Sequence, residues 1–359
     1  MIDFAPSEEQ QLIVETVRQF AKNEVRPVAR ECDEAGEIPA AVLTQAHELG
    51  LVANAFPEAH GGGGERSAVT GVLIAEELAW GDAAIALAIL SPGLAGFPVA
   101  DFGTEELRAA VLPRLTGPGF VPGSLALVEP RFGHDPLRPK AQAKAEGGGF
   151  VLAGEKCFVP WLDGGEHVVV TASLGEQARA FVVERGAPGL KAERERNMGL
   201  HGLATAELRL DGVRVPAGAA LAEGAVRGLV TRGRVALAAV AVGVARAAFE
   251  VARDYAKERH AFGVPIASKQ AIAFKLADMS IEIDGARLLC WEAAAALDRG
   301  DDALREATLA YQQARRVALE VSDGAVQVLG GHGYIREYLP EMHLRNARGF
   351  AAFEALALI

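Results

Sequence analysis

Cysteine is scarce in this sequence, and its placement argues against several classes of protein. The 359 residues contain three cysteines, Cys32, Cys157 and Cys290, which lie far apart. They form no CxxC pair, and no two histidines have the spacing of a metal site, so we expect no zinc site. An odd and sparse set of cysteines is typical of a reducing compartment, and we therefore expect a cytoplasmic protein.

Basic charge is in the minority. The chain has 36 Lys and Arg against 47 Asp and Glu, which gives a formal net charge of −11 at pH 7. This balance argues against nucleic acid as a main partner, because phosphate backbones are bound by clustered Lys and Arg. It remains compatible with a small anionic ligand held by a few local bases.

Long hydrophobic runs are also lacking. The longest run that could suggest a membrane segment, Val235 to Ala245, is too short to span a bilayer and ends at Arg246. We therefore expect no membrane span and interpret this run as a buried helix. The first ten residues, MIDFAPSEEQ, lack the charged and apolar regions of a signal peptide.

The composition is that of a globular protein, half apolar and 23% charged, and the length predicts two or three domains or one large one. In the first block, residues 1–120, apolar residues recur at helical spacing. Ser7 and Gln10 form a capping-box pattern before the first helix. We expect further helices, one of which breaks near Gly81 and another of which begins after Thr104 as its N-cap.

The pattern changes in the second block, residues 121–225. Gly and Pro become frequent, and apolar residues alternate, as Leu208 and Leu210 do. Four segments are predicted to be strands: GFVLAGEKCFVP, HVVVTASL, RAFVVER and TAELRLDGVRVP. Short strands at even spacing predict a β-barrel or sandwich and not a βαβ layout.

The third block, residues 226–359, returns to long helices. Gly330 and Gly331 predict the end of one of them, and a last helix is expected over roughly residues 341–356. Four long helices with short links form a four-helix bundle. The predicted fold is therefore mainly α with a middle β-domain, flanked by an N-terminal helical domain and a C-terminal helical bundle.

Several segments resemble the acyl-CoA dehydrogenase family, and they follow one another in the family's order along nearly the whole chain. They are NMGLHGLATAELRLDGVRVP, YAKERHAFGVPIASKQAIAFKLADM and DGAVQVLGGHGYIREYLPE, with weaker matches in FPEAHGGGGERS, FGTEELRAAVLPRL and LVEPRFGHD. The resemblance implies an N-terminal helical domain, a middle β-domain and a C-terminal four-helix bundle. It also implies FAD between the β-domain and the bundle, in a homotetramer or dimer whose neighbouring subunit holds part of each FAD.

The activity implied by the resemblance is α,β-desaturation of an acyl-CoA thioester, an oxidoreductase reaction of fatty acid metabolism. A base removes the α-proton, a hydride passes to FAD, and an electron-transferring flavoprotein is the usual electron acceptor. An α-proton beside a thioester is weakly acidic, so the site must stabilise the developing enolate. The base is expected to be a carboxylate in a water-poor place, where its pKa rises toward working pH.

The terminal stretch AAFEALALI contains one polar residue, Glu354. In the family the base is a Glu that follows an aromatic residue and lies nine residues beyond an Arg. Here Phe353 precedes Glu354, and Arg345 lies nine residues before it. The resemblance therefore implies that Glu354 is the catalytic base. The alternative is a solvent-facing Glu on a terminal helix, which is the usual place of an isolated Glu.

Other residues match family positions that contact the cofactor or the substrate. Arg259 matches an Arg on the FAD diphosphate of the adjacent subunit, which suits the paired donors of a guanidinium. Phe262, Gln327 and Gly331 match residues of the same cofactor region, and Arg234 matches an Arg near the acyl-CoA site. The alternatives are surface bases for the two arginines and a plain helix stop for the glycine.

The sequence departs from the family where flavin contacts are expected. Phe158, two residues before one of the changed positions, Pro160, is still expected to contact the cofactor. Hydroxyl-bearing, polar or small family residues are replaced by Val128, His134, Pro160, Ala355, Leu356 and Leu358. Each lost hydrogen bond is worth only about 1 kcal/mol, but several losses on one cofactor add up.

Two hypotheses follow from these departures. In the first, the chain is a working flavoenzyme in which backbone groups, Arg259 and Gln327 hold FAD and His134 donates a new hydrogen bond. In the second, it is a catalytically impaired paralogue with weak or no FAD binding, which binds an acyl thioester or serves as a structural partner. Retention of Glu354 favours the first, whereas Pro160 and Leu356 favour the second.

Overall fold

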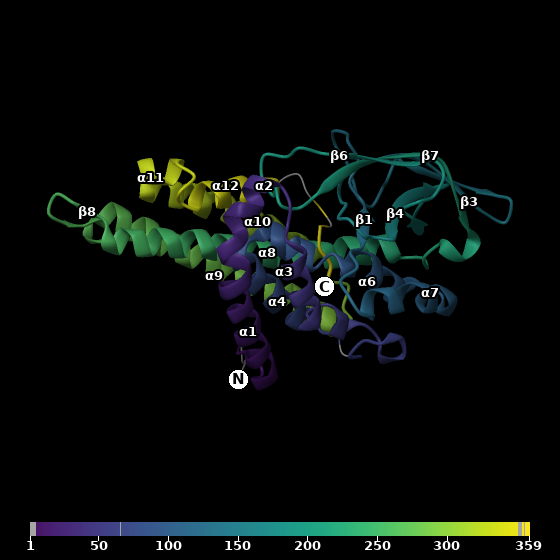
Figure 1. The fold of residues 1–359 in the computed structure, drawn as a ribbon, viewed down its shortest axis with the longest axis horizontal. Helices are drawn as coiled ribbons and strands as arrows, with labels where there is room; N and C mark the ends of the chain where they lie inside the picture. The colour runs from purple at the N-terminus through teal and green to yellow at the C-terminus, as the bar shows by residue number, and fades with distance from the viewer. Residues whose placement is uncertain (1–4, 65, 351–353, 355) are drawn as a thin grey trace.

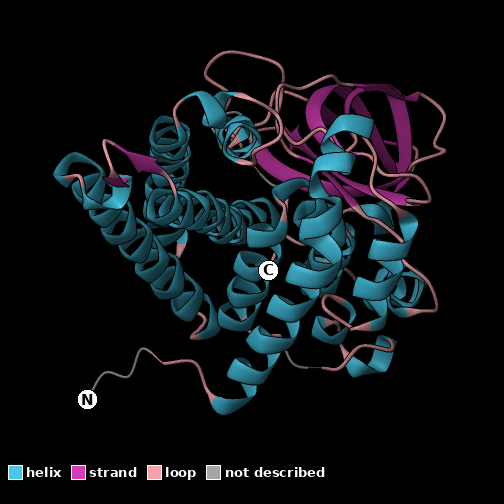
Figure 2. Ribbon diagram, turned by 60° about the vertical axis from the view of Figure 1, so that its left-hand side comes forward, coloured by secondary structure: helices cyan, strands magenta, loops and turns pink. Residues whose placement is uncertain are grey.

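The computed structural model describes residues 5–64, 66–350, 354 and 356–359. Helices fill most of the molecule, and the strands gather at one corner of it, apart from one small hairpin on the opposite side (Figure 2). The chain runs through N-terminal helices, then the β-domain, then long helices that lie side by side (Figure 1). This order agrees with the prediction of a mainly helical protein with a middle β-domain.

The N-terminal helices begin and end where local sequence signals place them. Ser7 caps the first helix through a complete capping box with Gln10, as predicted. The predicted break near Gly81 is confirmed, because Asp82 adopts an extended conformation and caps the next helix through the Ile85 N–H. Thr104 caps the last of the group, again as predicted. The helices are α1 (Glu8–Phe20), α2 (Ala29–Ala35), α3 (Ala40–Glu48), α4 (Ala68–Gly81), α5 (Ala83–Ile89), α6 (Pro92–Phe102) and α7 (Glu105–Thr116).

The β-domain is a seven-stranded sheet with a hydrophobic core of its own, separate from the main core. The strands are β1 (Ser124–Ala126), β2 (Gln142–Glu146), β3 (Gly149–Pro160), β4 (His167–Leu174), β5 (Gln177–Glu184), β6 (Leu190–Arg194) and β7 (Thr205–Pro216). Their order is β1-β4-β2-β3-β7-β6, and β5 pairs with β4. The long β3–β7 pair shifts register between Lys156 and Val159, which places Phe158 in a β-bulge with φ +55°.

The third group of helices is built around α8, which packs against α4, α9 and α10. The group comprises α8 (Ala225–Glu258), α9 (Gln270–Asp298), α10 (Leu304–Leu329), α11 (Gly331–Tyr334) and α12 (Pro340–Gly349), with the small hairpin β8 (His260–Ala261) and β9 (Val264–Pro265) after α8. Gly243 lets α8 cross α4 closely, since an added Cβ would lie 2.4 Å from the Glu76 carbonyl oxygen. α8 is long and apolar enough to span a membrane, but 78% of its apolar window is buried inside the molecule.

The last helix is shorter than predicted. It ends at Gly349 and not near residue 356, and Glu354 is not helical. Tyr311 explains part of this, because its hydroxyl donates to the Phe350 carbonyl at 2.6 Å and so satisfies an oxygen at the helix end. Phe353 and Ala355 lie outside the described residues. Residues 356–359 are buried, each at most 4% exposed.

Candidate functional site

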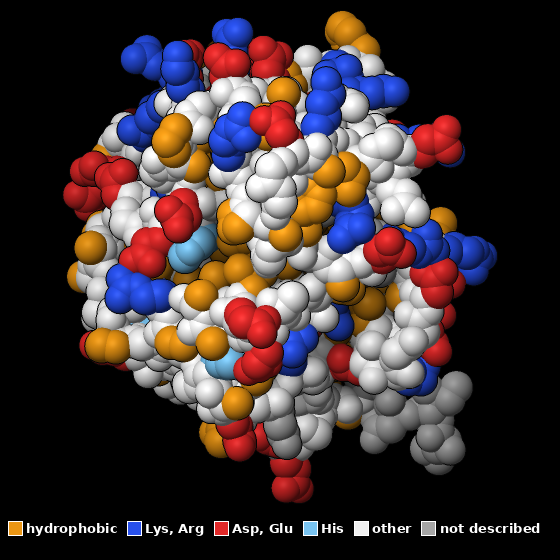
Figure 3. Space-filling model, turned by 90° about the vertical axis from the view of Figure 1, so that its right-hand side faces the viewer, with side chains coloured by type: hydrophobic (Ala, Val, Ile, Leu, Met, Phe, Trp, Pro, Cys, Tyr) orange, Lys and Arg blue, Asp and Glu red, His pale blue; other side chains and the backbone are white. Residues whose placement is uncertain are grey.

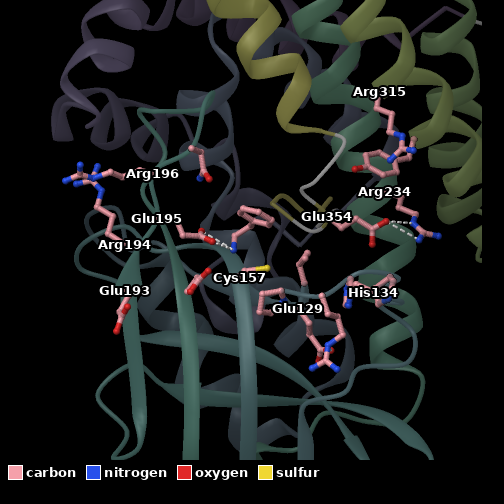
Figure 4. Close-up of a pocket in the computed structure, with 18 residues that line it drawn as sticks. Glu129, His134, Cys157, Glu193, Arg194, Glu195, Arg196, Arg234, Arg315 and Glu354 are labelled. Carbon is pink, nitrogen blue, oxygen red and sulfur yellow. Dashed lines mark hydrogen bonds and ion pairs between the residues drawn. The ribbon is translucent and has the colours of Figure 1, made fainter.

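A cleft of about 710 Å³ lies between the β-domain and the long helices (Figure 4). This is within the range of small-molecule and cofactor sites. The β-domain lines one wall with Val128, Pro130, Arg131, His134, Phe158 and Glu195 among others, and the helical wall carries Arg234, Tyr311, Arg315 and Glu354. The structure therefore brings Glu354, Arg234, His134 and Phe158, four of the residues singled out from the sequence, to one place.

Glu354 is held at the helical wall by α8. Arg234 donates to its Oε1 atom from Nη2 at 3.2 Å and from Nε at 3.4 Å. Arg234 is itself oriented by Thr308, whose hydroxyl lies 2.9 Å from Nη1. The Glu354 side chain is 22% exposed, and its second oxygen, Oε2, is buried and has no hydrogen-bond partner among the described residues. One oxygen therefore fixes the carboxylate, and the other has no partner among the described residues.

Phe158 forms part of the opposite wall because the bulge in β3 turns it out of the strand pattern. Its backbone N–H donates to both carboxylate oxygens of Glu195, each at 3.1 Å. This bond holds a non-glycine residue at positive φ, a conformation that otherwise carries strain. Burial raises the pKa of Glu195 above its usual value.

A buried ion pair anchors the loop that follows β1. Lys156 is fully buried and donates to Glu129 Oε1 at 3.0 Å and to the Thr171 hydroxyl at 3.1 Å. Glu129 also accepts the N–H groups of Lys140 and Ala141. Burial lowers the pKa of Lys156 to about 8, in spite of the carboxylate beside it. The pair closes the base of the loop that carries His134 to the cleft.

His134 has both ring nitrogens buried and without a partner among the described residues. Burial lowers the pKa of this ring below its usual value, although Glu129 and Glu354 oppose the shift. A neutral imidazole offers one N–H donor and one acceptor. A buried ring with neither group satisfied is rare in a folded protein, which makes His134 a candidate ligand contact.

Arg259, Phe262, Gln327 and Gly331 are not brought to this cleft. All four are exposed, Phe262 at 95%, at the end of the bundle far from the β-domain, near β8 and α11 in Figure 1. Tyr255 connects their two segments. Its carbonyl oxygen accepts the Arg259 N–H at 2.8 Å, and its hydroxyl lies 2.8 Å from Nδ1 of His332, next to Gly331.

Two of the departures from the family pattern do not line the cleft. Leu356 and Leu358 are 0% and 1% exposed and belong to the main hydrophobic core. The backbone oxygen of Ile359, which follows them, accepts hydrogen bonds from Arg66 and Arg232. Leucine at these two positions therefore serves burial of the terminal segment.

Sequence reasoning missed Arg315, Tyr311 and Glu195 as residues of the cleft. The signal that could have found two of them is the i, i+3, i+7 spacing of Thr308, Tyr311 and Arg315, which places them on one face of α10. Glu195 had no such signal, because its partner Phe158 lies in a bulge that the strand pattern does not reveal.

The residues present fit FAD. The cleft offers an aromatic wall at Phe158 and unpartnered polar atoms on His134 and Glu354. Pro160 offers neither hydroxyl nor N–H, and its carbonyl oxygen already accepts the Ser124 hydroxyl at 2.5 Å. Phe158 and His134 are therefore the residues of the β-domain wall that would hold the cofactor here. The described residues contain no group of His, Cys, Asp and Glu that could hold a metal ion.

Comparison with known proteins identifies this architecture. Models of the N-terminal, middle and C-terminal domains of acyl-CoA dehydrogenases match residues 7–117, 124–213 and 224–354. A probable acyl-CoA dehydrogenase of Bacillus subtilis is 38% identical, over 97% of this chain and 94% of that protein. Butyryl-CoA dehydrogenase of Megasphaera elsdenii has a TM-score of 0.90 at 31% identity, covering 99% of this chain and 96% of that one. A glutaryl-CoA dehydrogenase of Mycobacterium smegmatis in complex with FADH2 has a TM-score of 0.89 at 27% identity, covering 98% and 92%. The chain therefore belongs to the acyl-CoA dehydrogenase family, whose cofactor is FAD.

Proposed function

We propose that this chain catalyses the α,β-desaturation of an acyl-CoA thioester, with Glu354 as the base that accepts the α-proton. The observation that carries the proposal is the state of Glu354. Its carboxylate lies at the cleft with one oxygen on Arg234 and the other buried and unpartnered. A base needs an oriented lone pair that no other group occupies, and Oε2 has no partner among the described residues.

FAD, when bound, supplies the acceptor for the β-hydride. The remaining work falls to the protein's own residues. Arg234 orients Glu354 so that Oε2 receives the α-proton while the C=C bond forms. Phe158 presents a flat apolar surface on the opposite wall. Partial burial of Glu354 limits competing contacts with water, which strengthens electrostatic interactions at the site.

We also propose that the active form is a homo-oligomer. Arg259, Phe262, Gln327 and Gly331 are exposed far from the cleft of their own chain, where a second copy can use them. A further surface supports a partner subunit, since Phe274, Ile281 and Leu288 on α9 are 60%, 68% and 46% exposed and lie seven residues apart. A repeated apolar stripe of this kind is typical of an interface. Light scattering coupled to size exclusion measures the mass directly.

The acyl-CoA substrate and an electron-transferring flavoprotein are the partners that family membership supports. On the face in Figure 3, acidic and basic side chains are interspersed and form no extended patch of one sign. A cytoplasmic location is supported by three cysteines that are all free and buried.

The visible spectrum and anaerobic bleaching test the proposed reaction. We expect flavin bands in the purified protein, and loss of those bands when a suitable acyl-CoA from a panel is added without oxygen. Glu354→Gln should keep the flavin and slow bleaching by roughly 10²- to 10⁴-fold, because it removes the proton acceptor. The exposed Glu155 of the β-domain provides the matched control, and Glu155→Gln should bleach at the normal rate.

Other results would redirect the assignment. Normal bleaching of Glu354→Gln would show that another group is the base. A colourless protein that FAD cannot reconstitute would support the impaired paralogue, a binding or structural protein on the same scaffold.

A further inference from the structure

At the end of the cleft near Glu354, the positive charges of Arg234 and Arg315 outnumber the negative charge of the Glu354 carboxylate. Arg234 donates hydrogen bonds to the Glu354 carboxylate, which balances its charge, and to the Thr308 hydroxyl. Arg315 also lines the cleft, half-buried, with its guanidinium carbon 5.6 Å from the centroid of the Tyr311 ring. Among the described residues no carboxylate lies within ion-pair distance of Arg315. A half-buried guanidinium in a cleft is usually paired with an anion.

Arg315, Arg234 and Glu354 belong to one electrostatic neighbourhood. The charges of all three act on the Tyr311 hydroxyl, whose pKa is raised chiefly by burial. Figure 4 shows the two arginines on the helical wall, with Glu354 beside Arg234. The local sum is therefore two cations against one anion.

His134 faces the same region from the β-domain, on the other side of Glu354 (Figure 4). Its loop is ordered by Asp135, whose side chain accepts the Leu137 N–H at 2.9 Å. The two ring nitrogens of His134 are buried and have no partner among the described residues. The cleft thus has a charged donor on one wall and an unsatisfied neutral donor on the other.

We infer that Arg315 is an anion subsite on the helical wall of this cleft, which takes a phosphate or carboxylate group of the bound cofactor or substrate, and that His134 is a separate polar contact on the opposite wall. The inference rests on the proposed function and adds residues to it. Val128 lines the cleft without offering a side-chain donor, whereas Arg315 and His134 supply donors in the same cleft. The FAD diphosphate is one source of the anion, and a phosphate or second carboxylate of the acyl thioester is the other.

Flavin binding tests the first source without reference to turnover. FAD and riboflavin are titrated into protein freed of flavin, and flavin fluorescence is followed. If the subsite takes the diphosphate, Arg315→Gln weakens FAD binding by roughly ten- to hundred-fold, the range of a lost charge-assisted hydrogen bond, and leaves riboflavin binding unchanged. Arg315→Lys should restore part of the loss. Arg305→Gln is the matched control, because Arg305 lies on the same helix, outside the cleft, 81% exposed and paired with Glu306.

Thioester binding tests the second source. Calorimetry on the flavin-loaded protein compares butyryl-CoA, butyryl-pantetheine and glutaryl-CoA. If the subsite takes a CoA phosphate, Arg315→Gln weakens butyryl-CoA and spares butyryl-pantetheine. If it takes an acyl carboxylate, only glutaryl-CoA is weakened. Circular dichroism and the melting temperature establish that each variant is folded.

The inference is overturned if folded Arg315→Gln and His134→Ala bind FAD, riboflavin and all three thioesters as the parent does. The proposed function fails separately, if the parent binds FAD but no acyl-CoA bleaches it. The two failures are distinguishable, because the first concerns affinity in the variants and the second concerns the reaction of the parent.

Discussion

Two carboxylates of this protein pair with arginines of the same helix, α8, in different ways. Glu77 accepts hydrogen bonds from Arg246 at 2.8 and 2.6 Å and from Arg18 at 2.8 and 3.2 Å, so both of its oxygens are used. Glu354 uses one oxygen on Arg234 and leaves the other unpartnered among the described residues. Complete pairing marks a carboxylate that holds helices together, and incomplete pairing marks one that is available to a ligand.

The residues around Glu77 are also more completely paired than those around Glu354. Glu77 belongs to a joint between α1, α4, α8 and α9, in which Glu76 also accepts from Arg246 and Arg287. Burial would raise the pKa of Glu77, but Arg246 and Arg18 outweigh burial and lower it. The joint is therefore charged, and both carboxylate oxygens of Glu77 are paired. The cleft around Glu354 instead contains polar atoms of His134 and Glu354 without a partner among the described residues, and Arg315, which has no carboxylate partner among them.

The largest effect is expected when the joint is broken. Glu77→Gln should lower the free energy of unfolding by about 3 kcal/mol, because it leaves the largely buried Arg246 without its main partner. Urea denaturation followed by circular dichroism measures the loss. Asp254→Asn is the control, since it breaks an exposed pair with Arg253 on the same helix and should cost less than about 1 kcal/mol. Equal costs would remove the distinction between the joint and the surface.

A third carboxylate, that of Asp82, tests the opposite case, in which burial outweighs the attraction of a nearby arginine, Arg26. Burial raises the pKa of Asp82 from 3.8 to about 6, against the N-cap hydrogen bond from Ile85. The folded state then binds a proton more tightly than the unfolded state. Its stabilising contribution is complete below pH 3.8 and is lost as the pH rises through about 6, a change of about 3 kcal/mol.

Comparing the unfolding free energy of the parent with that of the Asp82→Asn variant, as a function of pH, measures this contribution. Asp82→Asn keeps a capping side chain but does not titrate. From about pH 4 to about pH 7, the parent should lose about 3 kcal/mol of unfolding free energy relative to the variant. A difference that is constant over this range would show that Asp82 titrates alike in both states.

A smaller effect is expected at the far end of the bundle. Tyr255→Phe removes the hydrogen bond to His332, worth about 1 kcal/mol, and so loosens the tie between the Arg259 and Gly331 segments. If these segments hold the FAD of a second subunit, FAD affinity falls by about five-fold. Fluorescence titration of the oligomer measures the change. Tyr334→Phe is the control, because Tyr334 is 84% exposed, and an equal effect there would argue against the positioning role of Tyr255.

The smallest effect on stability is expected at Glu354. Glu354→Gln removes the charge that accepts two hydrogen bonds from Arg234 at one oxygen, and a second oxygen without a partner among the described residues. The free energy of unfolding should therefore change by about 1 kcal/mol or less. The same substitution is expected to remove most of the activity. Parallel urea curves for Glu77→Gln and Glu354→Gln make the comparison direct, and equal losses would contradict it.

Much of the architecture followed from short-range patterns. The capping box at Ser7, the break after Gly81 and the cap at Thr104 were predictable because each depends on residues within one helical turn. The predicted strands and bundle helices likewise follow from periodicity, which records the face that must be buried. The family segments pointed to FAD because they preserve order and spacing along the chain.

The sequence by itself thus determined the order of helices and strands, the family and the candidate base. Only the tertiary structure decided which charges meet, since Glu77 and Arg246 are 169 residues apart and Glu354 and Arg234 are 120 apart. It also ended the last helix at Gly349, buried Leu356 and Leu358, and placed Arg315 at the cleft. The physical reason is that periodicity specifies which face of an element is buried, whereas the partner on that face comes from another part of the chain.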